Sequence, residues 1–204
     1  MKQLFLTSSF ADAAPMLQNF MTESLEGKKI AFIPTASNPE KVTFYVKSGK
    51  KALEKLGLQI TELDISSASS DLFTSTLINT DYIYVSGGNT FYLLQELRRT
   101  GTDKLIIEHI NSGKLYIGES AGSIIVSPNI SYVTRMDDCK KAPELTDFTS
   151  LACVDFYPLP HHTNVPFKKA VEKIIAEYGE KISLYPFSNK EAITVRGNEV
   201  TVVP

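Results

Sequence analysis

The sequence predicts an α/β fold, with a mostly parallel β-sheet, helices on both faces of the sheet and a C-terminal antiparallel hairpin. Apolar segments of strand length alternate with amphipathic segments of helix length along most of the chain. This alternation is typical of a parallel sheet covered by helices. Near the end, Gly197-Asn198 separates two short β-rich segments, as in a hairpin turn.

The length and composition predict one domain over residues 1–204. Of the 204 residues, 43% are hydrophobic and 22% are charged, which is ordinary for one soluble α/β domain. No repeat or linker interrupts the pattern, and every apolar run is shorter than a membrane span. The formal net charge of −2 and the lack of a basic cluster argue against a nucleic-acid partner.

The cysteines and the first residues bear on location. The two cysteines, Cys139 and Cys153, form neither a disulfide framework nor a metal site. The segment 1–9 alternates like a strand and lacks the apolar core of a signal peptide. We therefore expect a cytoplasmic protein.

The expected strands are short segments that are apolar or alternate between apolar and polar residues. In chain order they are Lys2–Thr7, Lys29–Pro34, Leu58–Ile65, Asp81–Ser86, Lys114–Gly118, Cys153–Pro158, Ile182–Tyr185, Ala192–Arg196 and Glu199–Val203.

The expected helices carry apolar residues at helical spacing, and Gly27 and Gly57 are expected to end the first two. Their ranges are Ala14–Leu25, Pro39–Leu56, Ser70–Ile78, Asn89–Arg99, Thr102–Ser112 and Val165–Tyr178, with a further helical segment at Ser123–Val126. The polar stretch 127–149 is expected to be a long loop, and long loops in compact domains are often functional.

The most informative motif is Gly118-Glu-Ser-Ala-Gly122, which lies between an apolar strand and an apolar helical segment. A sharp turn between a strand and a helix, with small residues around Ser120, exposes the serine hydroxyl as a nucleophile. A serine beside glycines is also a common turn former, so the motif requires a base elsewhere in the chain.

Two further loops follow predicted strands and are expected at the same edge of the sheet. In Ser86-Gly-Gly-Asn-Thr90, the glycines allow close backbone approach to a reacting atom; a tight turn capped by Asn89 is the alternative. Pro160-His-His-Thr-Asn164 contains two of the three histidines, and one of these two is best explained as the base for Ser120. His109 lies within a predicted helix and is interpreted as structural. No metal site is expected, because no cysteine or acidic residue stands at ligand spacing.

Together the three motifs, Ser86–Phe91, Gly118–Gly122 and Pro160–Asn164, resemble the peptidase E (aspartyl dipeptidase) family of serine peptidases, which also includes cyanophycinase. The resemblance extends over most of the chain. It implies a fold related to class I glutamine amidotransferases and hydrolysis of small peptides through an acyl-enzyme. No cofactor is expected, and a homo-oligomer is left open.

The resemblance also implies roles for individual residues. Ser120 matches the nucleophile, and His161 matches the base, with His162 at a variable position. Gly88 matches the glycine of the oxyanion hole, where its amide is paired with the amide of Ala121.

The third member of the triad is left open between two residues. The register of the following strand places Asn189 at the position where the family has an acidic residue. Glu191 lies two residues further on, and it would lie on the same side of an extended segment. Asp137 and Asp138, in the loop after the nucleophile, are further options.

Substrate binding is expected to involve Glu119 and Arg135. Family members that cleave after an N-terminal aspartate need a cation for its carboxylate, and the stretch 163–172 contains no arginine. Arg135 is the candidate, whereas Lys168 and Lys169 are better explained as solvent-facing. Glu119, beside the nucleophile, is expected to receive a substrate ammonium or to cap the helix start.

Three functions compete for this sequence. The favoured one is a serine peptidase, either a dipeptidase or another exopeptidase. An esterase of the α/β-hydrolase type also has Gly-x-Ser-x-Gly, but the chain is short for that fold and lacks a His-Gly-Gly-Gly oxyanion loop. A non-catalytic binding or regulatory protein would keep the turn at Ser120 as architecture, and asparagine at position 189 motivates that alternative.

Overall fold

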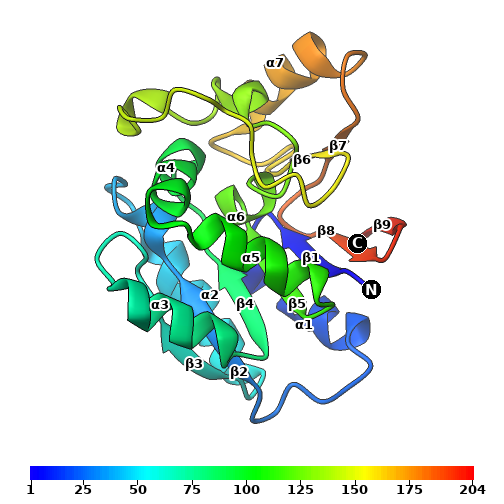
Figure 1. Ribbon diagram of the computed structural model, residues 1–204. Helices are drawn as coiled ribbons and strands as arrows, with labels where there is room; N and C mark the ends of the chain where they lie inside the picture. Colours follow the sequence, from blue (N-terminus) through cyan, green and yellow to red (C-terminus); the bar gives the residue numbers. More distant parts are fainter.

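The computed structural model describes residues 1–204, which form a seven-stranded sheet and a separate two-stranded sheet. The strands are β1 Gln3–Thr7, β2 Lys29–Ile33, β3 Gln59–Glu62, β4 Tyr82–Val85, β5 Leu115–Glu119, β6 Tyr157–Leu159, β7 Leu184–Pro186, β8 Ala192–Arg196 and β9 Glu199–Val203. The large sheet has the order β3-β2-β4-β5-β1-β8-β9. Its first five strands are parallel, and β8 and β9 are antiparallel at the edge beside β1 (Figure 1). The predicted α/β fold is confirmed.

Helices cover both faces of the large sheet. They are α1 Phe10–Phe20, α2 Phe44–Lys55, α3 Ser70–Ile78, α4 Thr90–Thr100, α5 Thr102–Asn111, α6 Ala121–Ile124 and α7 Lys168–Tyr178, with the 3-10 turns η1 Thr35–Ser37, η2 Ser131–Val133 and η3 Cys139–Lys141. No helix combines the length and the apolar character needed to cross a membrane.

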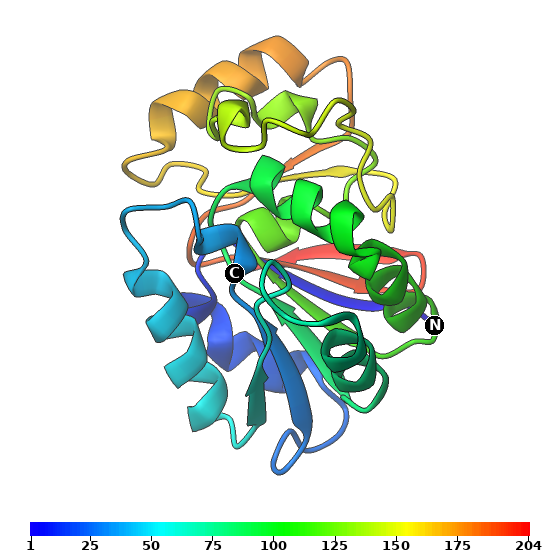
Figure 2. The same ribbon diagram turned by 60° about the vertical axis from the view of Figure 1, so that its left-hand side comes forward.

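Alternation along the strands assigns side chains to two cores. In β2, Ile30 and Phe32 pack with α1 and α2, whereas Ala31 and Ile33 pack on the opposite face with α3, α4 and α5. Successive residues of a strand point to opposite faces, so an uninterrupted apolar strand serves both cores. Figures 1 and 2 show the helices on the two sides of the sheet.

The starts of helices α1 and α2 differ most from the sequence prediction. Helix α1 begins at Phe10 rather than Ala14, because the Phe10 amide donates to the Glu119 carboxylate (2.9 Å), a partner remote in sequence. Helix α2 begins at Phe44 rather than Pro39, because the preceding residues fold into η1 and a tight turn. Val42 is therefore 60% exposed instead of forming part of a helical core stripe.

The predicted strands at Cys153–Pro158 and Ile182–Tyr185 are shifted and form their own layer. They correspond to β6 and β7, which pair in parallel with each other and not with the large sheet. The stretch 127–149 contains η2, η3 and one isolated bridge, as expected of a long irregular loop. Figures 1 and 2 show that this stretch, β6, β7 and α7 gather over one end of the sheet.

The register of the parallel strands brings three loops to that end. Thr7 pairs with Glu119, and Val85 pairs with Gly118, so β1, β4 and β5 finish side by side. The residues that follow these strands therefore meet at one edge, where parallel sheets place their ligand sites.

A stability test follows from the packing of α6 against β4. A Cβ on Gly122 would lie 2.1 Å from the Val85 carbonyl oxygen, so Gly122→Ala should lower the free energy of unfolding by about 3 kcal/mol. The control is Gly27→Ala, where a Cβ would meet nothing within 4 Å. Only the left-handed φ of 75° should then lower the free energy of unfolding, by about 1 kcal/mol. Urea unfolding measures the stability of both variants. If the two lose the same free energy of unfolding, the close contact at Gly122 does not determine the loss.

Candidate active site

Ser120 occupies a strained turn between β5 and α6. Its φ is 48° and its ψ is −106°, a conformation uncommon for a residue with a side chain. The Ser120 amide donates to the Thr7 carbonyl (2.8 Å), which holds the turn against the end of β1. A Cβ on Gly118 would lie 2.5 Å from the Gly122 carbonyl oxygen, so the turn closes only with glycine there. This is the backbone shape of a nucleophile elbow.

His161 faces this serine from the loop after β6. Its Nε2 lies 2.9 Å from Ser120 Oγ. The His161 backbone is also in the left-handed region, with φ 66°, and its amide donates to Ser8 Oγ (3.0 Å). The ring stacks on Phe167, with a centroid distance of 4.6 Å and an angle of 24°. Hydrogen bonding and packing therefore fix both the position and the tilt of the imidazole.

Asn189 lies on the other side of the imidazole. Its Oδ1 is 3.0 Å from His161 Nδ1, and its backbone amide donates to Asn164 Oδ1 (2.9 Å). An amide oxygen accepts a hydrogen bond, so Nδ1 carries the proton and Nε2 is left with a lone pair toward Ser120. The structure thus brings together three of the residues that the sequence singled out.

Glu191, the alternative partner of the imidazole, is used elsewhere. Its Oε2 accepts from the Ser188 amide (2.7 Å) and closes the turn before β8. Asp137 is also directed elsewhere, since its Oδ2 accepts from the amide and hydroxyl of Thr90. Neither carboxylate is bonded to His161, whereas Asn189 occupies Nδ1.

The environment favours the neutral form of His161. Burial lowers the pKa of the imidazole below its ordinary value of 6.5, and the hydrogen bond with Asn189 opposes this in part. The partner is an uncharged amide, so it orients the ring without strongly stabilising the imidazolium. The imidazole is therefore ready to accept a proton at neutral pH.

The Gly87-Gly88 loop lies against Ser120 and the turn η1. A Cβ on Gly87 would lie 3.2 Å from the Ser120 Cβ, and one on Gly88 would lie 2.1 Å from the Ala36 carbonyl oxygen. Gly88 has a φ of 139°, which a side chain would strain. Its amide donates to no acceptor in the protein, and the Ala121 amide, first in α6, has no intrahelical partner. The amides of Gly88 and Ala121, in the two turns next to Ser120, are thus free to donate hydrogen bonds.

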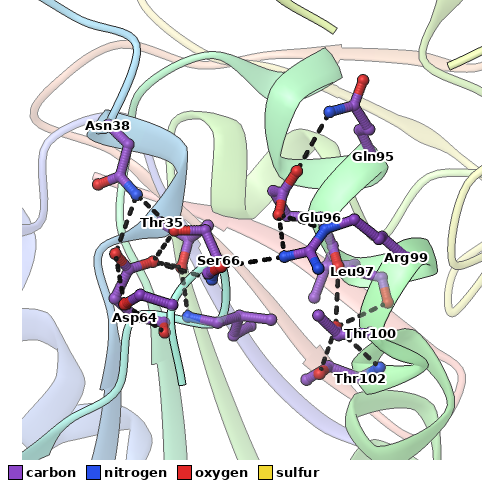
Figure 3. A network of polar contacts seen from close by, with 12 residues as sticks. Thr35, Asn38, Asp64, Ser66, Gln95, Glu96, Leu97, Arg99, Thr100 and Thr102 are labelled. Atoms are coloured by element: carbon purple, nitrogen blue, oxygen red, sulfur yellow. Dashed lines mark hydrogen bonds and ion pairs between the residues drawn. The ribbon is translucent and has the colours of Figure 1, made fainter. Parts of the chain in front are cut away.

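A polar network behind η1 holds that turn in place (Figure 3). Asp64 accepts hydrogen bonds from the Thr35 hydroxyl (2.9 Å), the Asn38 amide group (3.0 Å) and Ser66. Arg99 extends the network from α4 by donating to the Ser66 carbonyl (3.0 Å). This network links the loop after β3 and helix α4 to the turn on which Gly88 packs.

Three supporting residues were not predicted from the sequence. Ser8 holds the His161 backbone, and its hydroxyl donates in turn to the Phe187 carbonyl (3.1 Å). Asn164 holds the Asn189 backbone, and its place in the Pro160–Asn164 motif was a signal that it contributes to the site. Phe167 falls within the helix predicted at Val165–Tyr178; it lies directly before α7, and its ring stacks on His161.

Comparison with known proteins identifies the family of the chain. Residues 4–203 match the sequence model of peptidase family S51. The chain belongs to peptidase family S51. An uncharacterized peptidase of Listeria innocua is 58% identical over 98% of this chain and 95% of the relative. A peptidase E of a Nostoc species is 32% identical over 72% of this chain and 57% of the relative.

A solved structure gives the same result for the fold. A crystal structure from Listeria monocytogenes EGD-e, described as a candidate peptidase E, matches with a TM-score of 0.95 and 57% identity. The match covers 100% of this chain and 98% of that one. The predicted resemblance to the peptidase E family is confirmed, and the protein is a peptidase.

In this S51 peptidase, Ser120 and His161 open into a cavity of about 630 Å³. Its only cationic lining residue is Lys141, which pairs with Glu40 (2.7 Å). Apolar side chains surround the mouth, and Phe44 is 71% and Val165 86% exposed. No cluster of three or more histidine, cysteine or acidic side chains is arranged to hold a metal ion.

Of the two residues predicted to bind substrate, one lines the cavity and the other does not. Arg135 pairs with Glu177 on α7 (2.7 Å) and does not line the cavity. Glu119 lines the cavity but is 3% exposed, and its oxygens already accept from the Phe10 amide (2.9 Å) and the Tyr84 hydroxyl (2.6 Å). Glu119 therefore caps the start of α1, not the helix that follows it in sequence. Burial raises the pKa of its carboxyl.

The lowered pKa of His161 predicts how the reactivity of Ser120 changes with pH. Protonation of Nε2 removes the acceptor for the serine proton, so labelling of Ser120 by a fluorophosphonate should fall with decreasing pH, with its half-point below 6.5. Asn189→Asp places a negative charge beside the ring and should raise the half-point by about 1–3 units.

The control for this pH profile is His162→Gln, at the neighbouring histidine. It should leave the half-point unchanged, because only His161 contacts Ser120. Mass spectrometry of the labelled peptide gives the rate at each pH. If the half-point moves in His162→Gln but not in Asn189→Asp, the group that titrates is not His161 and the prediction is wrong.

Proposed function

We propose that the protein is a serine-type exopeptidase that hydrolyses small peptides through an acyl-enzyme on Ser120. The observation that carries the proposal is the continuous line from Ser120 Oγ to His161 Nε2 (2.9 Å) and from His161 Nδ1 to Asn189 Oδ1 (3.0 Å). Nucleophile, base and orienting group at hydrogen-bond distance are what acyl transfer requires. A cavity of about 630 Å³ suits a short peptide.

The first half of the reaction forms the acyl-enzyme. His161 Nε2 takes the proton of Ser120 as Oγ attacks the substrate carbonyl carbon. The carbonyl electron pair moves onto oxygen, and the resulting oxyanion accepts hydrogen bonds from the Gly88 and Ala121 amides. The carbon–nitrogen bond then breaks, and the imidazolium gives its proton to the leaving amine.

The second half repeats these steps with water. His161 takes a proton from water as the water oxygen attacks the ester carbon. The second oxyanion is bound by the same two amides. Collapse releases the carboxylic acid, and Ser120 Oγ regains its proton from the imidazolium. No step needs a group beyond these residues and water.

The orienting role falls to Asn189 in this proposal. A carboxylate would stabilise the imidazolium by charge, whereas the amide supplies orientation and the correct tautomer. The strained backbones of Ser120 and His161 support the proposal independently, since strain of this kind gathers at functional sites.

The role of Ser120 and His161 is tested by replacing each. Ser120→Ala and His161→Ala should each lower kcat for dipeptide hydrolysis by about 10³-fold or more, because the residues act as one unit. His162→Ala is the matched control and should retain activity within a few-fold. Hydrolysis of a dipeptide library is followed by mass spectrometry, and circular dichroism checks folding. If Ser120→Ala keeps activity within tenfold of the wild type, the acyl-enzyme proposal is wrong.

The orienting residue is tested by a second pair of variants. Asn189→Ala should lower kcat by about 10²-fold with little change in KM, because a misoriented imidazole affects the chemical step. Glu191→Gln should have little effect, since a glutamine oxygen can still accept from the Ser188 amide. The reverse order, a large loss in Glu191→Gln and none in Asn189→Ala, would assign the role to Glu191.

A further inference from the structure

The turn η1 is the surface on which Gly88 rests. A Cβ on Gly88 would lie 2.1 Å from the Ala36 carbonyl oxygen and 2.6 Å from the Ser37 nitrogen, so Gly88 packs directly against η1. The next amide, that of Asn89, donates to the same Ala36 carbonyl (2.8 Å). Because the Gly88 amide has no acceptor of its own in the protein, the packing on η1 fixes the direction of that amide.

A single carboxylate, that of Asp64, holds both ends of η1 (Figure 3). Its Oδ1 accepts from the hydroxyl of Thr35, the first residue of η1 (2.9 Å), and its Oδ2 accepts from the side-chain amide of Asn38, which directly follows η1 (3.0 Å). The Thr35 hydroxyl accepts in turn from the Ile65 amide (2.9 Å). The two hydrogen bonds to Asp64, here called the Asp64 clamp, join η1 to the loop after β3.

The Asp64 side chain is itself held in place. Its Oδ1 accepts from the amide (3.1 Å) and the hydroxyl (2.8 Å) of Ser66. Arg99 on α4 donates to the Ser66 carbonyl (3.0 Å). Helix α4 begins directly after Asn89, so the loop that carries Gly88 and the Asp64 clamp are both attached to this helix.

The Asp64 carboxyl is ionised although it is partly buried. Burial raises the pKa of the carboxyl, but the hydrogen bonds from Asn38, Ser66 and Thr35 outweigh burial and hold the pKa below its ordinary value of 3.8. Hydrogen bonds to a carboxylate are shorter and stronger than those to a neutral acceptor. The charge therefore strengthens the Asp64 clamp at neutral pH.

The position of η1 bears on the reaction through the Gly88 amide alone. Asp64, Thr35 and Asn38 do not line the cavity, so they do not touch a bound substrate. An oxyanion donor acts at about 2.7–3.1 Å from the oxyanion, and loss of one donor costs about 10²–10³-fold in kcat. A misplacement of about 1 Å costs about 10²-fold. A small displacement of η1 would therefore lower the rate.

We propose that Asp64 is a positioning residue of the hydrolysis, which clamps both ends of η1 and so sets the direction of the Gly88 amide that binds the oxyanion. The inference rests on the proposed function, in which that amide stabilises the tetrahedral intermediate. The competing interpretation is that Asp64 only stabilises the fold. The two differ for the folded enzyme, because a misplaced oxyanion donor lowers kcat without changing the affinity for the substrate.

Asp64→Asn breaks the Asp64 clamp whichever way the new amide turns. If its oxygen replaces Oδ1, its nitrogen faces the amide nitrogen of Asn38, and two donors meet. If it turns the other way, the Thr35 hydroxyl loses its acceptor. Thr35→Val opens one end of the clamp alone, whereas Thr35→Ser keeps the hydroxyl and should preserve the clamp.

Asp147→Asn is the matched control. Asp147 makes the same local pattern as Asp64, since its Oδ1 accepts from the amide (3.0 Å) and the hydroxyl (2.9 Å) of the residue two positions on, Thr149. It also pairs with an arginine of α4, Arg98 (3.1 Å). Asp147 is not bonded to η1 and does not line the cavity. A loss seen only in Asp64→Asn is therefore due to η1.

The first arm of the experiment measures turnover of the dipeptide that the wild type cleaves best. Asp64→Asn and Thr35→Val should lower kcat by about 10–10²-fold with KM within about twofold, because only the oxyanion contact is weakened. Thr35→Ser and Asp147→Asn should stay within about twofold of the wild type in kcat.

Folding is checked by circular dichroism and urea unfolding under the assay conditions. Asn38→Ala, at an exposed residue, opens the other end of the clamp and replaces Asp64→Asn if that variant does not fold. If the folded variants keep the wild-type kcat, or change KM alone, Asp64 is not a positioning residue, and Ser120 is unaffected as the proposed nucleophile.

The second arm reads the oxyanion site without peptide turnover. Phenylboronic acid forms a tetrahedral adduct with a nucleophilic serine, and one oxygen of the adduct takes the place of the oxyanion. Its dissociation constant is measured by protection of Ser120 from fluorophosphonate labelling. The constant should rise about tenfold or more in Asp64→Asn and Thr35→Val and stay unchanged in Asp147→Asn.

The second arm separates the inference from the proposed function. If the dissociation constant depends on Asp64 but the wild type cleaves no peptide, the positioning role is supported and the proposed peptide hydrolysis fails. If the wild type and Asp64→Asn bind phenylboronic acid equally, or if the wild type forms no adduct, the inference is overturned.

Discussion

The site depends on the hydrogen bonds made by the last residues of β1. The Thr7 carbonyl accepts from the Ser120 amide (2.8 Å) and from the Ser123 hydroxyl (2.8 Å), and the Thr7 hydroxyl donates to the Gly118 carbonyl (3.0 Å). The next residue, Ser8, accepts from the His161 amide (3.0 Å). The end of β1 thus holds both Ser120 and His161, although these residues are 41 positions apart in the chain.

This arrangement explains how two strained backbones persist together. Ser120 and His161 both have positive φ, and each such conformation costs of order 1–3 kcal/mol. The surrounding parallel sheet and the buried hydrogen bonds at its carboxyl edge supply the stabilisation, so the distance between Oγ and Nε2 is set before substrate arrives.

The electrostatics of the site divide into two parts. Ser120, His161 and Asn189 carry no fixed charge, whereas the cavity that they line has more carboxylates than cationic side chains. In the mechanism we propose, the imidazolium receives little help from its partner. A cavity of negative character would then act mainly on the substrate, by favouring cationic groups and excluding anionic ones. Catalysis and selectivity would be carried by different residues.

The sequence by itself determined the fold class, because the alternation of strand and helix patterns leaves few alternatives to a covered parallel sheet. It also indicated Ser120 and the Gly87-Gly88 loop, since tight turns after strands require specific residue types, and the resemblance to the peptidase E family selected His161 over His162. The register of the following strand favoured Asn189, but the sequence did not rule out Glu191, which is two residues further on. In the structure, Glu191 accepts from the Ser188 amide, and Asn189 faces the imidazole. Likewise, only the tertiary structure turned Arg135 toward Glu177, placed Glu119 at the start of α1 and directed Asp137 to Thr90. Those outcomes depend on which remote backbone and side-chain groups reach each residue, and local sequence does not encode that information.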